Sequence, residues 1–409
     1  MRWSQALICS TAAITCALVW GCGGVEAEQV SSPKMAEGEG VLAFFLNDST
    51  TVRIPGAKTG ATLTLRNAEE LLTLKSSDSL CYQVPVFNGR VCLDESGAGT
   101  WADILRTGDT PYEVPVRWEA SPTPQADNWT DTLVWRLAFG AEDPWYGDLV
   151  VQKAASGALK GTVETATGDF RFLHGALRGD TLALQTFDGA HLFHFSATLA
   201  ADSLHAGWFA SGSHYGTPFV GWPKGPADAH LSEGQQAQWT GLPVTYTGKN
   251  LVASNQSWKW ERGGDTVHVV SIMGSWCPNC MDEHRLLKQL LNDHSNVRVH
   301  TLAFERGTER DNGEKTALNR LKAYSEEMEL WRYEGRWDIT LVGPASKKEA
   351  QQRLPFLDKV VSFPTTVILH PQSDQPWVHS GFNGPATGAK FDLEKKRFYA
   401  AINGPSESR

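Results

Sequence analysis

The sequence predicts an α/β fold at the C-terminus, preceded by an antiparallel all-β region that forms a sandwich or a barrel. Two observations predict this division. Residues 41–235 consist of short apolar runs separated by Gly- and Asp-containing turns, which is typical of antiparallel hairpins. From residue 236 onward, buried strand patterns alternate with amphipathic helical patterns, which is typical of α/β folds. The length of 409 residues also exceeds that of one ordinary domain.

Residues 1–21 have the pattern of a secretory signal. A basic residue precedes a short apolar stretch over residues 6–20, and Gly21 and Cys22 follow it. A small residue before a cysteine at this place resembles the lipobox of bacterial lipoproteins, in which the signal is removed and Cys22 is lipidated. An ordinary secretory signal that leaves no anchor is the alternative. Gly23 stands where inner-membrane lipoproteins carry an aspartate, which favours the outer membrane.

Residues 22–40 are small, polar and acidic without any period, which predicts a flexible tether. The β pattern follows it and is clearest over residues 160–212. Five apolar runs there are separated by turn signals, and we expect them to pair as antiparallel strands. The runs are KGTVETA, FRFLHGAL, TLALQTF, HLFHFSATL and LHAGWFASG.

Charge and histidine placement limit the classes of ligand. The net charge of −9 argues against a nucleic-acid partner. Residues 160–214 contain five histidines, but His191 and His194 are three apart on a predicted strand and so point to opposite faces of the sheet. We therefore expect no metal site, and we interpret these histidines as solvated or hydrogen-bonded sheet residues.

The α/β pattern begins after a stretch rich in Gly, Pro and Gln over residues 221–236. An apolar strand is expected at 267–273, an amphipathic helix from 278 to about 291, and a second strand at 297–304. The remaining elements are expected as a helix over 314–330, a strand over 337–342, a helix over 347–353, paired strands at 367–369 and 377–379, and a closing helix over 391–402.

The seven cysteines fall into three groups: Cys9, Cys16 and Cys22 in the targeting segment, Cys81 and Cys92 in the β region, and Cys277 and Cys280 in the α/β region. An oxidising compartment would permit a structural disulfide between Cys81 and Cys92. A tight turn at Asn88-Gly89 would not place these two opposite each other, so a bridge needs a longer or bulged hairpin. Two buried, unpaired thiols are the alternative.

Cys277 and Cys280 lie where the expected buried strand gives way to the expected helix, in the sequence Trp276-Cys277-Pro278-Asn279-Cys280. The first sulfur there faces unpaired helix N–H groups and the positive end of the helix dipole, which favours its thiolate. The second sulfur, about one helical turn on, can expel whatever the first has captured. The spacing therefore predicts dithiol–disulfide exchange. A zinc ribbon would need a second CxxC or a histidine pair at a suitable distance.

The same motif, followed about 85 residues later by Ser362-Phe363-Pro364-Thr365-Thr366-Val367, resembles the thioredoxin-fold thiol–disulfide oxidoreductases of the TlpA/ResA type. Those proteins are periplasmic and often membrane-tethered. The resemblance covers residues 236–409. It implies that Pro364 is cis and lies against the Cys277–Cys280 pair, that Phe363 offers backbone groups to a substrate strand, and that Trp276 helps to shape the surface.

The family also places a glutamate three residues after the second cysteine, and Glu283 has that position. The resemblance implies that Glu283 takes the proton from Cys280. A solvated helix glutamate in an i,i+4 pair is the alternative. Two positions depart from the family, because Arg285 replaces a usual proline and Ser271 stands where thioredoxin has a buried aspartate.

The front region and the back region together also resemble lipoproteins of a TlpA-like or redoxin-containing kind. Two segments of the β region contribute to this resemblance, Thr167–Arg171 and Thr186–His191. The resemblance implies no chemistry for them.

These observations predict a periplasmic lipoprotein, held at the membrane by its lipid anchor, that exchanges dithiols for disulfides on other periplasmic proteins, as a reductase. No cofactor is expected besides the redox-active Cys277–Cys280 disulfide. Electrons would come from a membrane thiol-transfer donor of the DsbD or CcdA type.

Two alternatives stay open at this point. In one, the β region is the functional unit of a binding or assembly lipoprotein, and the α/β region is a scaffold. In the other, the protein is a thiol peroxidase. Peroxiredoxins carry a proline and a threonine or serine seven and three residues before the peroxidatic cysteine, whereas Val270 and Gly274 have those positions here, so peroxidase activity is the weaker alternative.

Overall fold

The computed structural model describes residues 37–77, 80–87, 89–103, 112–121, 128–226, 228, 231 and 236–404. The predicted signal over residues 1–21, Cys22 and most of the predicted tether lie outside the described residues. No helix among the described residues is both long enough and apolar enough to cross a membrane.

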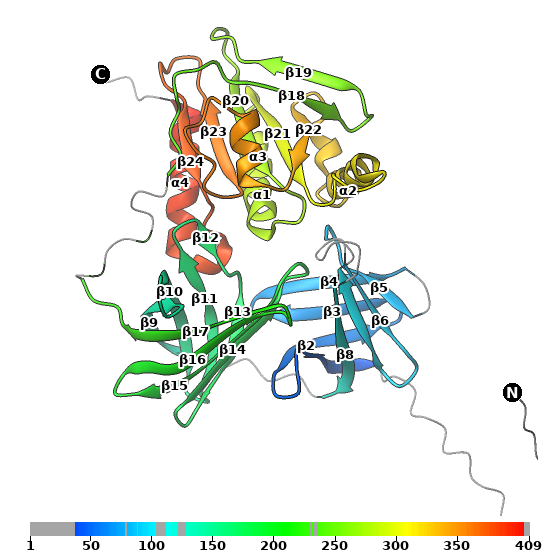
Figure 1. Ribbon diagram of the computed structural model, residues 1–409, viewed down its shortest axis with the longest axis vertical. Helices are drawn as coiled ribbons and strands as arrows, with labels where there is room; N and C mark the ends of the chain where they lie inside the picture. The colour runs from blue at the N-terminus through cyan, green and yellow to red at the C-terminus, as the bar shows by residue number, and fades with distance from the viewer. Residues whose placement is uncertain are drawn as a thin grey trace, which may run out of the picture.

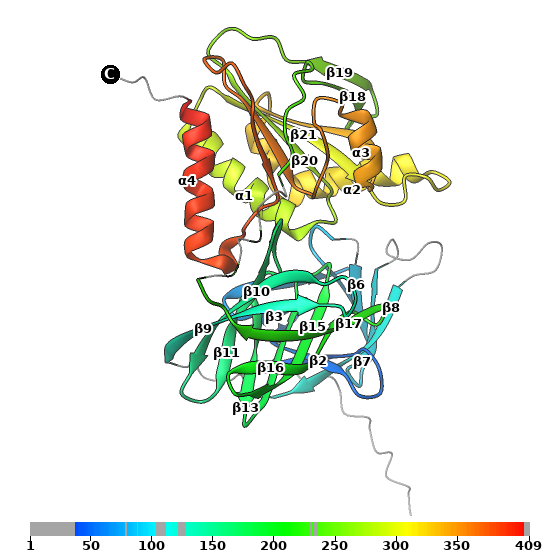
Figure 2. The ribbon, with the colours of Figure 1, turned by 60° about the vertical axis from the view of Figure 1, so that its left-hand side comes forward.

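The described chain folds into three sheets, which follow one another along the sequence. Figure 1 shows the α/β unit at the top and the two β units beneath it, and Figure 2 shows the same arrangement from another side. The predicted β region is therefore divided into two units. Residues 121–128, Ser-Pro-Thr-Pro-Gln-Ala-Asp-Asn, separate them in the sequence, and two prolines in this stretch are a boundary signal.

The first unit is a closed barrel in which β1 pairs with β8. Its alternating strands place Phe44 and Trp101 in the interior, where both are fully buried. The strands are β1 (Gly38–Phe45), β2 (Thr51–Thr59), β3 (Thr62–Asn67), β4 (Glu70–Ser76), β5 (Cys81–Gln83), β6 (Gly89–Leu93), β7 (Ala98–Asp103) and β8 (Tyr112–Ala120).

The second unit is an antiparallel sheet of nine strands in the order β10-β9-β17-β16-β15-β14-β13-β11-β12. The five hairpin runs predicted over 160–212 are confirmed as strands of this sheet, with FRFLHGAL starting its strand three residues later than expected. The strands are β9 (Trp129–Phe139), β10 (Trp145–Ala154), β11 (Ala158–Thr165), β12 (Gly168–Asp169), β13 (Leu173–Arg178), β14 (Thr181–Phe187), β15 (Leu192–Ala200), β16 (Ser203–Ser211) and β17 (Tyr215–Pro223).

The two β units are locked together at the end of β14. The Phe187 ring packs at 4.8 Å from the Phe44 ring and 5.1 Å from the Trp101 ring, inside the barrel core. The fully buried Asn67 of the barrel donates to the Phe187 carbonyl at 2.8 Å and accepts from the Phe187 N–H at 3.1 Å. A buried amide side chain that bonds both the N–H and the carbonyl of a residue in the other unit fixes the position of the two units relative to each other.

The third unit is a sheet of seven strands in the order β19-β18-β22-β21-β20-β23-β24, and β20, β21 and β22 are parallel. The predicted elements are confirmed, and a hairpin over residues 245–259 is added that the sequence analysis did not predict. The elements are β18 (Thr245–Asn250), β19 (Asn255–Lys259), β20 (Val267–Met273), α1 (Pro278–Asp293), β21 (Val297–Glu305), α2 (Gly313–Glu327), η1 (Leu330–Tyr333), β22 (Trp337–Pro344), α3 (Lys347–Arg353), β23 (Thr365–Leu369), β24 (Trp377–Ser380), η2 (Pro385–Thr387) and α4 (Ala389–Asn403).

The central strand β20 is buried on both faces, as its apolar run predicts. Val269 and Met273 belong to the core beneath α1, α2 and α4, whereas Val270 and Ile272 belong to the core beneath α3. Because α1 begins directly after β20, its first turn lies at the end of the sheet that faces the two β units (Figure 2). This placement decides where the cysteine pair lies.

Candidate functional site

The cysteine pair lies at the first turn of α1. Cys277 is the N-cap residue, with extended backbone angles, and Pro278 follows at the first helical position, where a missing N–H costs nothing. The Cys277 sulfur accepts from the Cys280 N–H at 3.2 Å, and the two sulfurs are bonded to each other. Cys280 is fully buried and Cys277 is 6% exposed, so Cys277 is the sulfur nearer to the surface.

The loop before the pair is anchored by a buried carboxylate. Glu305, fully buried at the end of β21, accepts from the Ser275 N–H at 2.7 Å and from its hydroxyl at 2.8 Å. Arg320 neutralises this carboxylate at 3.1 Å. The indole of Trp276 donates to the Phe304 carbonyl at 3.0 Å, and the Arg306 guanidinium lies 4.5 Å above its ring. These contacts fix the residues next to Cys277.

The bond between Phe363 and Pro364 is cis, the form that the resemblance implies for this position. The Phe363 carbonyl oxygen lies 3.5 Å from the Cys277 sulfur. The Phe363 ring meets the Trp276 ring edge-on at 5.6 Å. The structure therefore brings together four residues that the sequence analysis singled out, Trp276, Cys277, Phe363 and Pro364.

Glu283 lies fully buried one turn of α1 beyond Cys280. Its carboxylate accepts from the Ser271 hydroxyl at 2.5 Å and from the Thr366 hydroxyl. Burial raises the pKa of Glu283 to about 7, although both hydroxyls oppose that shift. Ser271, which stands where thioredoxin has a buried aspartate, thus contributes a hydroxyl that bonds the Glu283 carboxylate.

The solvated-helix alternative for Glu283 is contradicted by this burial. Arg285, the second departure, points elsewhere and pairs with Asp282 at 2.8 Å. A carboxylic acid that changes charge near neutral pH beside a buried thiol is suited to accept a proton from it.

The β units also contribute residues to the turn between the two cysteines. Asn279 donates to the carbonyls of Asp169 and Phe382 at 3.2 and 3.3 Å. Gly168 allows this close approach, because it has a φ of +151° and an added Cβ would lie 2.4 Å from the Asn279 amide nitrogen. Asp169 in turn accepts from the Gly384 N–H at 2.8 Å.

A buried arginine joins all three units at this point. Arg171, which is 2% exposed, donates to the Pro278 carbonyl at 3.2 Å and forms ion pairs with Asp282 of α1 and Glu70 of the barrel. Burial raises the pKa of Glu70, with Arg171 opposing the shift, and burial raises the pKa of Asp169 to about 7. The predicted segment Thr167–Arg171 therefore lies at the cysteine pair, which its spacing in the sequence could not show.

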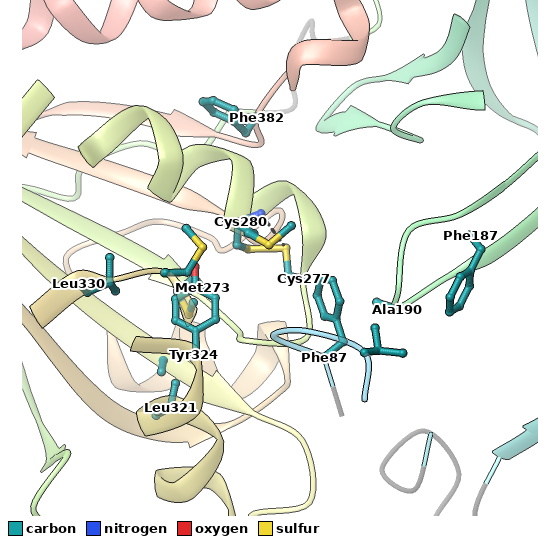
Figure 3. Packing of buried hydrophobic residues seen from close by; sticks show 14 of the residues in the cluster. Phe87, Phe187, Ala190, Met273, Cys277, Cys280, Leu321, Tyr324, Leu330 and Phe382 are labelled. Atoms are coloured by element: carbon teal, nitrogen blue, oxygen red, sulfur yellow. Dashed lines mark hydrogen bonds between the residues drawn. A yellow bond between two sulfur atoms is a disulfide. The ribbon is translucent and has the colours of Figure 1, made fainter. Parts of the chain in front are cut away.

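The second predicted segment, Thr186–His191, reaches the site as well. Its residue Ala190 lines a small hollow with Phe87 of the barrel and with Trp276. Figure 3 shows the Phe87 ring between Cys277 and Ala190. The hollow measures about 20 Å³, which is room for about one water molecule. Both β units therefore reach Trp276, the residue directly before Cys277.

Cys81 and Cys92 are bonded to each other and face each other in β5 and β6. The connection between these strands runs over residues 84–88, so the hairpin is longer than a tight turn, and it carries Phe87. The disulfide thus holds the base of the hairpin whose residue Phe87 lies at Trp276, beside Cys277. The predicted lipidation residue Cys22 lies outside the described residues.

No cluster of His, Cys, Asp or Glu in the described part of the chain has an arrangement that would hold a metal ion. His191 lies in a turn, 3.1 Å from the Asp188 carboxylate, and not on the strand where it was predicted. The larger hollows lie away from the sulfurs. One of about 680 Å³ is beside Lys249, and one of about 570 Å³ is beside His379.

No protein-family model matches the sequence, and no curated protein matches it. Solved structures similar to this chain include the pneumococcal exposed lipoprotein thioredoxin Etrx1 from Streptococcus pneumoniae, with 13% identity over 40% of this chain and 100% of that one and a TM-score of 0.27. A DsbF homologue from Corynebacterium diphtheriae has 15% identity over 44% of this chain and 100% of that one, with a TM-score of 0.28. A thiol:disulfide interchange protein from Bacteroides sp. has 16% identity over 43% and 96%, with a TM-score of 0.27. Thioredoxin-like thiol–disulfide oxidoreductases are thus what this chain is similar to, and at these TM-scores the likeness carries no conclusion about its activity.

Proposed function

We propose that this protein exchanges dithiols for disulfides on protein substrates through Cys277 and Cys280. One observation carries the proposal. The Cys277 sulfur caps helix α1, is bonded to Cys280, and lies 3.5 Å from the carbonyl that precedes the cis proline. A helix N-terminus stabilises a thiolate, and a second sulfur three residues on can resolve a mixed disulfide.

In the reductase direction, the Cys277 thiolate attacks one sulfur of a substrate disulfide, and the other substrate sulfur leaves as a thiolate that takes a proton from water. Glu283 then takes the proton of the Cys280 thiol, and the Cys280 sulfur attacks Cys277. The Cys277–Cys280 bond forms, and the second substrate sulfur leaves as a thiolate that takes a proton from water. The protein dithiol is oxidised by two electrons, and the substrate disulfide is reduced by two.

The two β units belong to this site in our proposal. Arg171 and Asn279 bond the β units to the turn between the cysteines, and Phe87 lines a hollow with Trp276 on the side of Cys277 that Figure 3 shows. A substrate reaches the sulfur by displacing the tip of the β5–β6 hairpin, so the barrel takes part in selecting it. This arrangement disfavours the alternative in which the β region works alone and the α/β unit is a scaffold.

We also propose a cellular location and an electron donor for this reaction. We propose a mature protein anchored by lipidated Cys22 on the periplasmic side of the outer membrane, acting on disulfide-containing periplasmic proteins. A membrane thiol-transfer donor would return Cys277 and Cys280 to the dithiol, because the periplasm is not held at a reducing poise by a thiol buffer.

The test is covalent trapping with the full-length protein. Cys280→Ser should accumulate a mixed disulfide between Cys277 and a disulfide-containing protein, visible as a reducible mass increase. Cys277→Ser is the matched control and should trap nothing. A redox titration of the wild-type protein should show a reversible two-electron couple. The proposal fails if no such couple is found and no mixed disulfide forms with any disulfide substrate.

A further inference from the structure

A row of polar residues crosses the buried face of the seven-stranded sheet beneath α1 and α4. Cross-strand register places Ser271 of β20 opposite Thr301 of β21 and opposite Thr366 of β23, and it places Thr366 opposite His379 of β24. Residues that face each other directly point to the same side of a sheet. We call these four residues, Thr301, Ser271, Thr366 and His379, the polar row. Its first three members are fully buried.

The helices above place acids directly on the polar row. Glu283 of α1 bonds to Ser271 and Thr366, as described above. Glu394 of α4, also fully buried, bonds to the His379 imidazole at 2.6 Å. Two buried acids therefore lie on neighbouring members of one row, with the Thr366 hydroxyl between them. A hydroxyl both donates and accepts, so it can link a carboxyl group on one side to an imidazole on the other.

The row reaches solvent at one end only. The His379 side chain is 12% exposed and lines the cleft of about 570 Å³ between the α/β unit and the nine-stranded sheet. Lys390 and Arg397 line the same cleft. At the other end, His284 bonds to Ser271 at 3.2 Å and to the Tyr324 hydroxyl at 2.7 Å, and both are fully buried. The cross-strand pair of Thr366 and His379 is therefore the place where a proton that leaves Glu283 can pass toward the cleft.

One further observation sets the His379 end apart. The Glu394 oxygen Oε2 makes no hydrogen bond among the described residues, and its nearest cation is Arg397 at 3.6 Å. A buried carboxylate oxygen without a hydrogen-bond donor is costly.

We propose that His379, held by Glu394, is the proton exit of the site, which passes the proton of Glu283 through Thr366 to water in the cleft. The inference rests on the proposed function, because the route carries away the proton that Cys280 loses while it attacks Cys277. His379 touches neither substrate nor sulfur, so it is a positioning residue that acts through Glu283.

This route accounts for the proton that the Cys280 thiol loses in each turnover. Glu283 gains the proton of the Cys280 thiol when Cys280 attacks Cys277. In the same step the Glu283 carboxyl gives a proton to the Thr366 hydroxyl, whose own proton passes to the His379 imidazole and on to water. Glu283 is again a carboxylate and can accept the next proton. No electron moves in this step.

The groups that face Glu283 come from every element packed around it. The uncharged ones are Ser271, Thr366, His284 and Tyr324, and the chargeable ones are His379 and Glu394. His379 lowers the pKa of Glu283 and Glu394 raises it, while burial acts more strongly than either. Burial holds the pKa of His284 at about 3, so His284 stays neutral and does not compete for the proton.

The experiment separates the two chemical steps. The reduced full-length protein is mixed with an aromatic disulfide that releases coloured nitrothiobenzoate. The first release reports attack by Cys277, and the second reports resolution by Cys280. His379→Gln keeps a donor to Glu394 but cannot carry a proton, and His370→Gln, in the turn of the same hairpin, is the matched control. In dilute buffer, His379→Gln should slow the second release about tenfold and leave the first unchanged.

Imidazole distinguishes a proton route from a structural effect. Added imidazole can enter the cleft and should restore the second release in His379→Gln. It should not restore it in Thr366→Val, where the break lies before the cleft. A second release in His379→Gln that equals wild type, or one that is slow and unaffected by imidazole, overturns the inference. If wild type itself gives no release at all, the proposed function fails instead.

Discussion

Glu283 makes the stability of the α/β unit depend on pH in a direction that can be calculated. Burial raises the pKa of this carboxyl from its ordinary 4.5 to about 7. Below pH 4.5 the folded and unfolded states both hold the proton, so the group costs nothing. Above pH 7 the folded state carries a buried carboxylate. The free energy of unfolding falls by about 1.4 kcal/mol for each pH unit between the unfolded pKa and the folded pKa, or by about 3 kcal/mol in total. Stability from this group is therefore lost as the pH rises from 4.5 to 7.

Replacing Glu283 by Gln removes this cost and keeps acceptor and donor atoms for Ser271 and Thr366. The variant should match wild type near pH 4.5 and exceed it by about 3 kcal/mol at pH 8. The measurement is urea unfolding of the oxidised protein followed by helical circular dichroism, because α1 to α4, the α-helices among the described residues, all lie in this unit. Glu327→Gln removes an exposed carboxyl and is the control. A difference between Glu283→Gln and wild type that does not change with pH would refute the reasoning.

Three further changes test how the β units hold the site. Arg171→Met removes the buried cation that pairs with Glu70 and Asp282, although Asp282 keeps Arg285, and should cost about 3–5 kcal/mol in urea unfolding; a cost below about 1 kcal/mol would contradict the ion network. Phe87→Ala should speed alkylation of reduced Cys277, measured by mass increase, whereas Trp208→Ala, on an exposed aromatic, should not. Removing the Cys81–Cys92 disulfide by a double Ala change should speed the same alkylation and lower stability by about 3 kcal/mol; unchanged alkylation would show that the disulfide does not brace the hairpin.

The α/β unit could be predicted from the sequence because its signals are local. The apolar run Val267–Met273 is a strand with the expected ends, and the helix after it starts at Pro278 as its N1 proline predicts. The cysteine pair needed only this junction to be placed. The hairpin over 245–259 was missed because its residues are polar and exposed in alternation, with no buried period to find.

The remainder of the site could not be predicted, because it depends on residues that meet only in the folded chain. Arg171 lies 111 positions from Asp282 in the sequence, and each is an ordinary charged residue by itself. Phe87 lies in the connection between β5 and β6, and no sequence pattern around it indicates a contact with the α/β unit. The polar row depends on strand register, and a shift of one residue would turn His379 to the other face. Thr167–Arg171 and Thr186–His191, which were singled out by resemblance, lie at the turn between the cysteines and at Trp276 respectively.

The charges around α1 bear on the direction of exchange. The helix N-terminus favours the Cys277 thiolate, but the cluster beneath it holds one buried cation against an excess of acids, Glu70, Asp169, Asp188 and Asp282. Burial raises the pKa of Asp169 to about 7, whereas His191 and Arg171 outweigh burial and lower the pKa of Asp188. This excess of negative charge opposes formation of the Cys277 thiolate.

A reduced form that is not stabilised as a thiolate gives a low reduction potential, so we expect a potential nearer to about −270 mV than to about −120 mV. Asp282→Asn should then raise the potential, by about 30 mV for each 1.4 kcal/mol of thiolate stabilisation gained. An unchanged or lower potential in that variant would mean that the acids do not destabilise the Cys277 thiolate, and the reductase direction would lose its electrostatic basis.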